Sequence, residues 1–359
     1  MHKICLVLAC NIYIMPFLYK YRALLESCGE NADLIYWNRD GIEEKEPSNI
    51  RLIPFNRKAT YNDGNKSKIL SFVLFAKFVK KTVMQNEYDR ILFLGTYGGT
   101  PVLLFPFLRK NKGKYWIDIR DYTYEKYAMY YTAEKIAIDN SAFSIVSSEG
   151  YKSFLPEHEY IITHNVDLEA INECMKIPYT QDSGIRISFI GNVRYIEENK
   201  KLLRALGNDR RFRLQYYGMG SEVIERYCKE AGIDNVDFCG RFDHEKTAEL
   251  YAKTDIINNV YGSTGIELTT ALSNKLYFAA GLHKPILVSP NTYMETISKQ
   301  YGFGVTFDEN DDHFADNLYR YYHSFSEENI SGCIKFYEKV MNDEKVFSDK
   351  FKQFIIGGN

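Results

Sequence analysis

The stretch SNKLYFAAGLHKPILVS, residues 273–289, is the part of the sequence that best defines the fold. Residues 274–282 carry apolar side chains at helical spacing, and residues 285–289 form a short apolar run that begins at a proline. Ser273 is a suitable N-cap for the helix. A helix followed directly by a buried strand is typical of a parallel sheet in an α/β protein.

The same alternation of short apolar runs and longer amphipathic ones occurs in both halves of the chain. In the first half it predicts strands at 3–10, 32–37, 90–94, 114–119, 142–147 and 159–163, with helices at 17–28, 66–86 and 124–139. In the second half it predicts strands at 185–190, 211–217, 235–239, 254–260, 285–289 and 303–307, with helices near 197–206, 221–231, 244–253, 274–282 and 311–324. We therefore expect an α/β protein with two doubly wound, Rossmann-like domains.

The boundary between the domains is expected near residue 167. Residues 168–184 include Pro178 and Gly184 and lack sustained periodicity, so we interpret them as a linker. Residues 1–167 and 185–335 then form the two domains. Because parallel strands bind ligands at their carboxyl ends, we expect substrates in a cleft between the domains.

Composition excludes several classes of protein. The chain has 359 residues, 45% of them hydrophobic and 26% charged, and its net charge is −2, so no global field attracts nucleic acid. Seven cysteines without a Cys-x-x-Cys pair argue against a disulfide framework and against structural zinc, and favour a cytoplasmic location. The apolar run from Ile4 to Leu8 is too short for a signal sequence, and no run of about 18 apolar residues could span a membrane.

Lys275 is the clearest candidate for a binding residue. It falls in the first turn of the helix expected after Ser273, where the helix dipole is positive and backbone N–H groups lack partners. A bound phosphate would accept hydrogen bonds from those N–H groups, from the lysine and from the Asn274 amide. The alternative is an ordinary solvated lysine at a helix start.

Several segments, taken in their order along the chain, resemble GT-B glycosyltransferases related to family 4. They are YDRILFLGTYGG (88–99), YWIDIRDY (115–122), THNVD (163–167), ISFIGNVR (187–194), YYGMGSE (216–222), NVDFCGRF (235–242) and the stretch from Tyr261 to Ile286 that contains Asn274-Lys275. The resemblance covers nearly the whole chain. It implies that the terminal segment, residues 336–359, is a helix that returns to the first domain.

The resemblance also implies a donor site in the second domain, where a nucleoside diphosphate-sugar serves as substrate and no metal or other cofactor is needed. The donor-binding residues are expected to be Gly191, Asn192, Arg194, Gly218, Arg241, Tyr261, Ser273, Asn274 and Lys275. Glycines at strand ends would let the backbone approach the ligand, and the cations would stabilise the diphosphate as it leaves.

Two positions depart from the family pattern. Phe278 stands where the family usually has a glutamate that contacts the donor ribose. The stretch YIEEN (195–199) stands where the family usually has a lysine, with Glu198 near the expected place. Glu267 is a candidate to replace the missing carboxylate. The alternative for Glu267 is a surface glutamate.

On the acceptor side, the resemblance places candidate residues at the strand ends of the first domain. Asp121 is a candidate general base, with Arg120 beside it, and His164 is a second candidate. The structural alternatives are an ion pair between Arg120 and Asp121, and a histidine with a purely structural role. Asn11, Tyr97 and Gly98 are the expected acceptor-binding residues.

Residues 66–83 combine five lysines with three phenylalanines, as a basic amphipathic helix on anionic lipid would. The alternative is a packing helix with a wet lysine face. Peripheral contact with the cytoplasmic face of the inner membrane would suit a lipid-linked acceptor.

The function expected from the sequence is transfer of a sugar, with a UDP-sugar as the favoured donor, to a lipid-linked or oligosaccharide acceptor in surface polysaccharide or capsule assembly. One alternative is a catalytically degenerate subunit that binds a partner transferase. The other is a sugar-nucleotide epimerase of the GT-B type.

Overall fold

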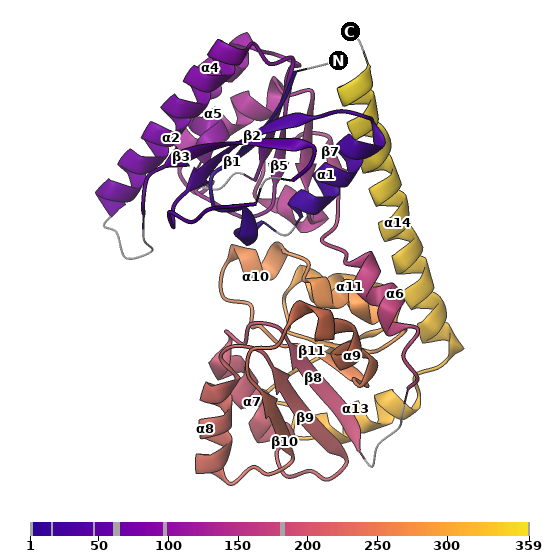
Figure 1. The fold of residues 1–359 in the computed structure, drawn as a ribbon. Helices are drawn as coiled ribbons and strands as arrows, with labels where there is room; N and C mark the ends of the chain where they lie inside the picture. The colour runs from indigo at the N-terminus through magenta and orange to yellow at the C-terminus, as the bar shows by residue number, and fades with distance from the viewer. Residues whose placement is uncertain are drawn as a thin grey trace. The chain divides into compact units, whose positions relative to one another are not determined.

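The computed structural model describes residues 3–15, 17–45, 47–59, 65–95, 99–179 and 184–357. The chain folds as two compact units (Figure 1). The first unit comprises the residues up to His164 together with those from Asn342 onward, and the second comprises Asn165–Met341.

The first unit is built on a parallel sheet. Its seven strands in the described part of the chain are β1 (Ile4–Leu8), β2 (Ala32–Asn38), β3 (Ile50–Asn56), β4 (Arg90–Leu94), β5 (Tyr115–Ile119), β6 (Phe143–Val146) and β7 (Tyr160–Ile162), in the order β3-β2-β1-β4-β5-β6-β7. The helical segments are η1 (Ile12–Ile14), α1 (Leu18–Ser27), α2 (Asn65–Asn86), α3 (Thr100–Leu103), α4 (Phe105–Lys110), α5 (Ala128–Asp139) and η3 (Glu149–Ser153). The strand order reverses beside β1, which is the doubly wound arrangement.

The second unit repeats this plan. Its six strands, counted over the described residues, are β8 (Ile185–Ile190), β9 (Phe212–Tyr217), β10 (Val236–Cys239), β11 (Ile256–Asn259), β12 (Ile286–Val288) and β13 (Gly304–Thr306), in the order β10-β9-β8-β11-β12-β13. The helical segments are α6 (Leu168–Cys174), α7 (Ile196–Leu206), α8 (Ser221–Ala231), η4 (His244–Lys246), α9 (Thr247–Ala252), α10 (Ile266–Thr270), α11 (Asn274–Gly281), α12 (Tyr293–Gln300), α13 (Phe314–His323) and α14 (Glu327–Ile356). The expected fold of two doubly wound parallel sheets is confirmed.

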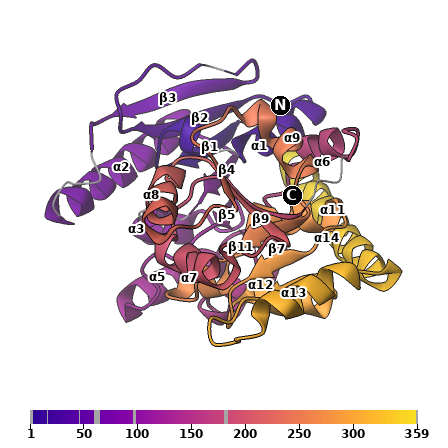
Figure 2. The ribbon, with the colours of Figure 1, turned by 90° about the horizontal axis from the view of Figure 1, so that it is seen from below.

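Strand β3 is the element of the first sheet that the sequence pattern did not predict. It lies at the edge of the sheet, beside β2 (Figure 2), and most of its side chains are partly or fully exposed. Its sequence contains Arg51 and Pro54 and so lacks a continuous apolar run. An edge strand tolerates both, because one side of its backbone needs no partner strand.

Helix α6 occupies the first part of the expected linker. The carboxylate of Asp167 caps it, accepting a hydrogen bond from the Ala170 amide at 3.0 Å. Ile171 is fully buried and packs in the core of the second unit. Residues 180–183 of the expected linker lie outside the described residues.

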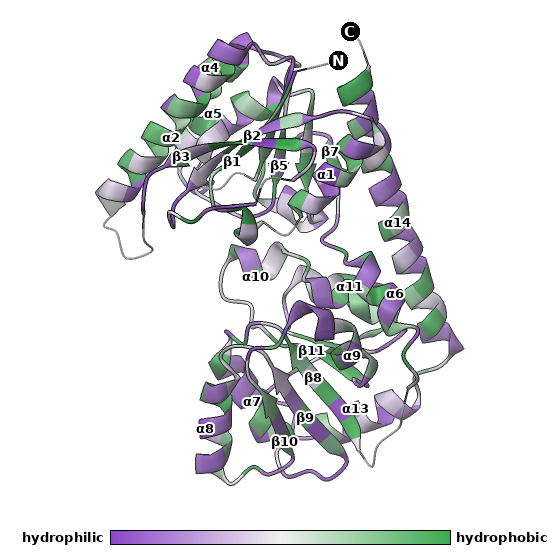
Figure 3. Ribbon diagram, in the orientation of Figure 1, coloured by the Kyte–Doolittle hydropathy of each residue, from purple (hydrophilic) through white to green (hydrophobic). Residues whose placement is uncertain are grey.

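Helix α14 contributes to both hydrophobic cores. Its residues up to Met341 belong to the second unit, and those from Asn342 belong to the first. Hydrophobic and hydrophilic residues alternate along it (Figure 3). In the first unit Phe347, Phe351 and Phe354 pack around Trp116, with Phe354 stacked on the indole at 5.5 Å.

The phenylalanines of α2 face the first sheet rather than solvent. Phe75 is fully buried, Phe72 lies 5.1 Å from Trp37, and Phe78 lies 5.3 Å from Phe55, measured between ring centroids. This packing is the alternative that the sequence left open, and Lys77, Lys80 and Lys81 of the same helix are exposed. None of the described helices is long and apolar enough to cross a membrane.

Helix α5 carries a buried acid, Glu134. Both of its carboxylate oxygens are buried and have no hydrogen-bond partner within the described ranges. Burial, and then the neighbouring charge of Glu125, raises the pKa of Glu134 to about 8. In an unfolded chain the same group would titrate near 4.5, so the folded state binds its proton more tightly.

We expect Glu134→Gln to flatten the pH dependence of stability. A pKa raised by folding gives stability that is fully present below pH 4.5 and is lost as pH rises toward 8. Between pH 5 and pH 8 the wild-type free energy of unfolding should therefore fall by about 2 kcal/mol or more relative to the variant. Urea unfolding followed by tryptophan fluorescence measures this, because both tryptophans, Trp37 and Trp116, belong to the first unit.

The matched control is Glu159→Gln, which neutralises an exposed glutamate of the same unit. Its pH profile should follow that of the wild type. If the stability of Glu134→Gln has the same pH dependence as the wild type from pH 5 to pH 8, then folding does not raise the pKa of Glu134.

Candidate functional site

Two glycine turns meet at the carboxyl ends of the central strands of the second unit. Gly191 follows β8, and its amide donates to the Tyr217 carbonyl at 2.9 Å. Gly218 follows β9 and has φ +132°, a backbone conformation that favours glycine. A Cβ on Gly218 would lie 1.9 Å from the carbonyl oxygen of Gly191. The two turns therefore pack backbone against backbone, and only a glycine fits at Gly218.

Gly218→Ala is expected to destabilise the second unit by about 3 kcal/mol, because positive φ and a backbone clash add together. The matched control is Gly232→Ala, at the end of α8. Gly232 also has positive φ, at +66°, but a Cβ there would meet no atom within 4 Å. Its cost should be about 1 kcal/mol. Calorimetric unfolding of both variants measures the difference in stability. Equal losses of stability in Gly218→Ala and Gly232→Ala would show that the backbone clash does not contribute.

Lys275 lies at the start of α11 and is almost fully buried, at 4% exposure. The Ser273 hydroxyl caps the helix by accepting a hydrogen bond from the Lys275 amide at 3.3 Å. The Lys275 ammonium donates to the Tyr261 hydroxyl at 2.7 Å and lies 3.9 Å from the centroid of the Phe189 ring. It is therefore held on aromatic faces and a phenol, with no carboxylate partner among the described residues. The solvated-lysine alternative is wrong.

The strand ends of β11 and β12 hold Tyr261 in place. The Ser289 hydroxyl accepts hydrogen bonds from the amides of Tyr261 and Gly262, at 3.0 and 2.7 Å. The Tyr195 ring packs on the Tyr261 ring with centroids 4.4 Å apart. Burial raises the pKa of Tyr195, while the nearby charge of Arg194 lowers it. Lys275, Tyr261 and Tyr195 thus form one cationic and aromatic cluster.

Of the other expected donor residues, Arg194 lies closest in contact to this cluster, through Tyr195. Arg194 is exposed, and its guanidinium lies 5.7 Å from the Tyr195 ring centroid. Asn192 and Arg241 are exposed on the loops after β8 and after β10, and Asn274 is exposed as the first residue of α11. The structure therefore brings Lys275 and Tyr261 into direct contact and leaves the cations at 194 and 241 open to solvent.

The two departures from the family pattern have structural explanations. Phe278 is buried and stacks face to face on Tyr251, with centroids 3.8 Å apart, so this position belongs to the core. Glu198 forms an ion pair with Lys201 at 3.2 Å on the surface of α7. Glu267 is exposed, and its charge contributes to raising the pKa of Tyr195.

Asn11, an expected acceptor-binding residue, is fully buried in the first unit. Its amide nitrogen donates to Asn38 and Glu44, at 3.1 and 3.2 Å, and its oxygen accepts from the amides of Arg39 and Asp40, at 3.0 and 3.1 Å. These bonds fix the loop after β2, and the acceptor role expected for Asn11 stays a prediction. Tyr97 and Gly98 lie outside the described residues.

Arg120, an expected catalytic residue, forms a buried ion pair with Asp118. Their closest atoms are 2.7 Å apart, and neither side chain is more than 5% exposed. The Tyr21 hydroxyl also donates to the Asp118 carboxylate, at 2.5 Å. The bond from Tyr21 to Asp118 joins α1 to β5, and the ion pair holds the Arg120 guanidinium beside Asp118. Asp121, the next residue, is exposed at the carboxyl end of the strand.

His164 lies in a buried network of hydrogen bonds. It is 3% exposed, and its Nε2 atom lies 3.0 Å from the Asp343 carboxylate. Its backbone amide donates to Glu344, and its carbonyl accepts from Lys20 at 2.7 Å. These bonds attach the last part of α14 to the first unit, and the catalytic role expected for His164 stays a prediction.

Tyr261 was expected from the sequence, but two other aromatic residues of this cluster were missed, Phe189 beside Lys275 and Tyr195 beside Tyr261. Phe189, inside β8, reads as an ordinary core residue, and Tyr195 lies 80 positions before the lysine. Tyr195 comes four residues after Gly191. That position was the one indication in the sequence that Tyr195 follows the end of a strand. No group of three or more potential metal ligands occurs in the described part of the chain.

Comparison with known proteins identifies the fold. No family model and no curated protein sequence matches the chain. The structure is similar to a sucrose-phosphate synthase from Thermosynechococcus elongatus, with a TM-score of 0.69 and 13% identity over 98% of this chain and 99% of that one. It is similar to HepE from Anabaena in complex with UDP and glucose, with a TM-score of 0.66 and 12% identity over 98% and 99%. It is also similar to WaaG, a glycosyltransferase involved in lipopolysaccharide biosynthesis, with a TM-score of 0.64 and 11% identity over 99% and 100%. The chain thus has the GT-B fold.

Proposed function

We propose that the chain is a glycosyltransferase that moves a sugar from a UDP-sugar to a glycan or lipid-linked acceptor in surface polysaccharide assembly. The observation that carries the proposal is the buried ammonium of Lys275, held at the start of α11 by Tyr261. A cation at the positive end of a helix is unfavourable by itself. A bound diphosphate would make the arrangement favourable, because its negative charge interacts with both the cation and the helix start. HepE, one of the similar structures, is described in complexes with UDP, with UDP and glucose, and with UDP-glucose.

The second unit would bind the donor. Lys275, the N–H groups at the start of α11 and the exposed Arg194 would hold the diphosphate and stabilise the charge that develops as the glycosidic bond breaks. The glycine turns at Gly191 and Gly218 would let the backbone approach the donor, and Arg241 would frame the base. In this proposal the positive groups serve where other enzymes use a divalent ion.

The acceptor would be activated by a carboxylate of the first unit. Asp121 is exposed at the end of β5, and Asp118 and Arg120 form a buried ion pair with each other. Asp121 would accept the proton of the acceptor hydroxyl as that oxygen attacks the sugar. A lipid-linked acceptor is part of the proposal, because WaaG acts in lipopolysaccharide biosynthesis and because Lys77, Lys80 and Lys81 are exposed on α2.

We expect Asp121→Asn to lower kcat about a hundredfold, because a positioned general base contributes at least that much. The KM for the donor should stay within a factor of three, since Asp121 lies in the first unit and the donor residues lie in the second. The measurement is release of UDP from UDP-sugars in the presence of a membrane extract as acceptor source, with separation of the glycosylated product.

The matched control is Asp139→Asn, an exposed aspartate at the end of α5 that pairs with Lys135. It should leave kcat unchanged. An unchanged kcat in Asp121→Asn would remove this residue from the mechanism. UDP binding without any transfer would instead indicate a degenerate subunit, and conversion of the UDP-sugar without an acceptor would indicate an epimerase.

A further inference from the structure

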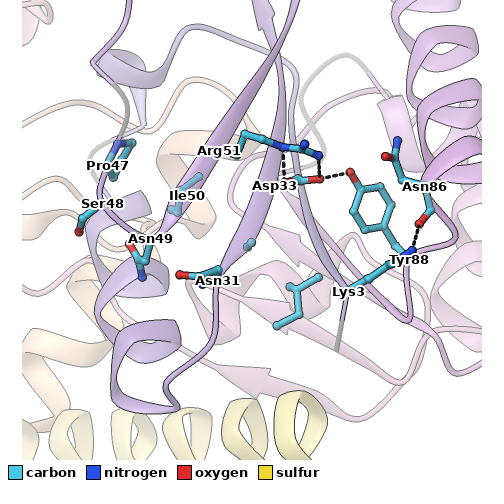
Figure 4. A pocket seen from close by; sticks show the side chains of 12 residues that line it. Lys3, Asn31, Asp33, Pro47, Ser48, Asn49, Ile50, Arg51, Asn86 and Tyr88 are labelled. Atoms are coloured by element: carbon cyan, nitrogen blue, oxygen red, sulfur yellow. Dashed lines mark hydrogen bonds and ion pairs between the residues drawn. The ribbon is translucent and has the colours of Figure 1, made fainter. Parts of the chain in front are cut away.

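The first unit has a cavity of about 420 Å³ at the amino ends of β1, β2 and β3. The loops considered above follow the carboxyl ends of the strands, so the cavity lies at the opposite edge of the sheet. Figure 4 shows it between the turn at residues 47–49 and the Asn31 side chain on one side, and Lys3 and Tyr88 on the other. Its volume is within the usual range for small-molecule sites.

The cavity has an apolar floor. Ile4, Ala32 and Ile50 begin their strands and pair with one another in register, Ile4 with Ala32 and Ala32 with Ile50. All three are at most 5% exposed. Such a floor suits the C–H face of a sugar ring, which is apolar while its rim carries hydroxyl groups.

One wall is a preformed polar group around Asp33. Its carboxylate accepts two hydrogen bonds from Arg51, at 2.9 and 2.5 Å, and a third from the Tyr88 hydroxyl (Figure 4). Arg51 remains largely exposed. A guanidinium has five N–H groups and Asp33 takes two of them, so Arg51 keeps donors for a ligand. The carboxylate fixes the orientation of the guanidinium in advance.

The remaining polar groups have unused hydrogen-bonding capacity. The Asn49 side-chain oxygen is buried and has no partner among the described residues, while its nitrogen donates to the Arg22 carbonyl at 3.2 Å. The Lys3 ammonium donates once, to the Asn86 carbonyl at 3.2 Å, and has two further N–H groups. Lys3 and Arg51 give the lining two positive charges against one on Asp33. The Asp89 carboxylate, outside the lining, accepts a hydrogen bond from the Lys3 backbone amide at 3.0 Å. The N–H groups that Lys3 and Arg51 keep for a ligand favour one with a carboxylate.

We propose that this cavity binds an acidic saccharide, with its carboxylate at Lys3 and Arg51, its hydroxyls on Asn31 and Asn49, and its ring on Ile4 and Ala32. A free phosphate would leave the apolar floor and the amides unused. A neutral sugar would leave the remaining N–H groups of Lys3 and Arg51 without a carboxylate partner. The inference stands on the first unit alone and does not rest on the proposed function.

The test is a titration of the full chain followed by the Ile4 and Ile50 methyl resonances, with the fully buried Ile257 of the second unit as internal reference. The probes are D-glucuronate, the tetramer of galacturonic acid, D-glucose and inorganic phosphate. We expect saturable shifts of the Ile4 and Ile50 methyls with glucuronate, with the tetramer, or with both, and no such shifts with glucose or phosphate. Binding of glucuronate would show that a free acidic monosaccharide is a sufficient ligand. Binding of the tetramer alone would show that the cavity takes an acidic sugar within a longer saccharide chain.

Lys3→Gln should weaken the binding about tenfold, because it removes the positive charge that would face the ligand's carboxylate while roughly keeping the length of the side chain. The matched control is Lys80→Gln, an exposed lysine on α2, which should bind as the wild type does. Equal shifts with glucose or with phosphate, no shifts at all, or undiminished binding by Lys3→Gln would each overturn the proposal. A UDP titration of the same sample reports separately on the donor site.

Discussion

Arg120→Ala is expected to lower the free energy of unfolding of the first unit by about 3–5 kcal/mol. The substitution leaves the fully buried Asp118 carboxylate with the Tyr21 hydroxyl and without the cation that neutralises it. It also removes a guanidinium that lies 4.1 Å from the Phe17 ring centroid. An unpaired buried charge costs far more than an exposed ion pair contributes.

Urea unfolding followed by tryptophan fluorescence measures this loss, because Trp37 and Trp116 report on the first unit alone. The matched control is Arg109→Ala, which removes an exposed arginine in the last turn of α4 and should change stability by less than about 0.5 kcal/mol. A loss below about 1 kcal/mol in Arg120→Ala would contradict the structural role of the ion pair.

Lys275→Met is expected to weaken UDP binding about a hundredfold. Methionine keeps the length of the side chain in a buried position but removes the charge that would face the diphosphate. Charge-assisted hydrogen bonds are worth about 1.5–3 kcal/mol each, and 2.7 kcal/mol corresponds to a hundredfold change in affinity. Removing such a donor in a transferase would also lower kcat, because its contribution grows as the leaving group gains charge.

Two further variants separate the contribution of the Lys275 charge from that of the Tyr261 hydroxyl and from that of an exposed lysine. Tyr261→Phe keeps the ring under the ammonium and removes the hydroxyl that accepts its hydrogen bond, so it should cost about fivefold. Lys253→Ala removes an exposed lysine of the same unit and should bind UDP as the wild type does. Equal UDP affinity in Lys275→Met and the wild type would contradict the assignment of the donor site.

The strands were predictable from the sequence because parallel strands buried on both faces read as continuous apolar runs. All twelve expected strands are present within two residues at each end. The edge strand β3 was missed because Arg51 and Pro54 interrupt that signal. Helices α3 and α4 are short and carry prolines near their starts, so they gave no sustained helical period.

The candidate site was predictable only in part. The motif at Asn274-Lys275 predicted the helix that α11 forms, but nothing local indicates that Lys275 is buried or that the Phe189 ring lies beside it. The ion pair between Arg120 and Asp118 could have been predicted from the sequence. Residues 118 and 120 share one face of a strand and residue 121 does not, so alternation alone favours Asp118 as the partner.

Calorimetric titration of UDP into the full chain in the presence of EDTA tests the proposed donor site most directly. We expect one site per chain with a Kd in the micromolar range, about a hundredfold weaker binding by Lys275→Met, and unchanged binding by Lys253→Ala. No binding of UDP, GDP or dTDP at millimolar concentration, with EDTA or with added magnesium, would contradict a nucleotide-sugar transferase.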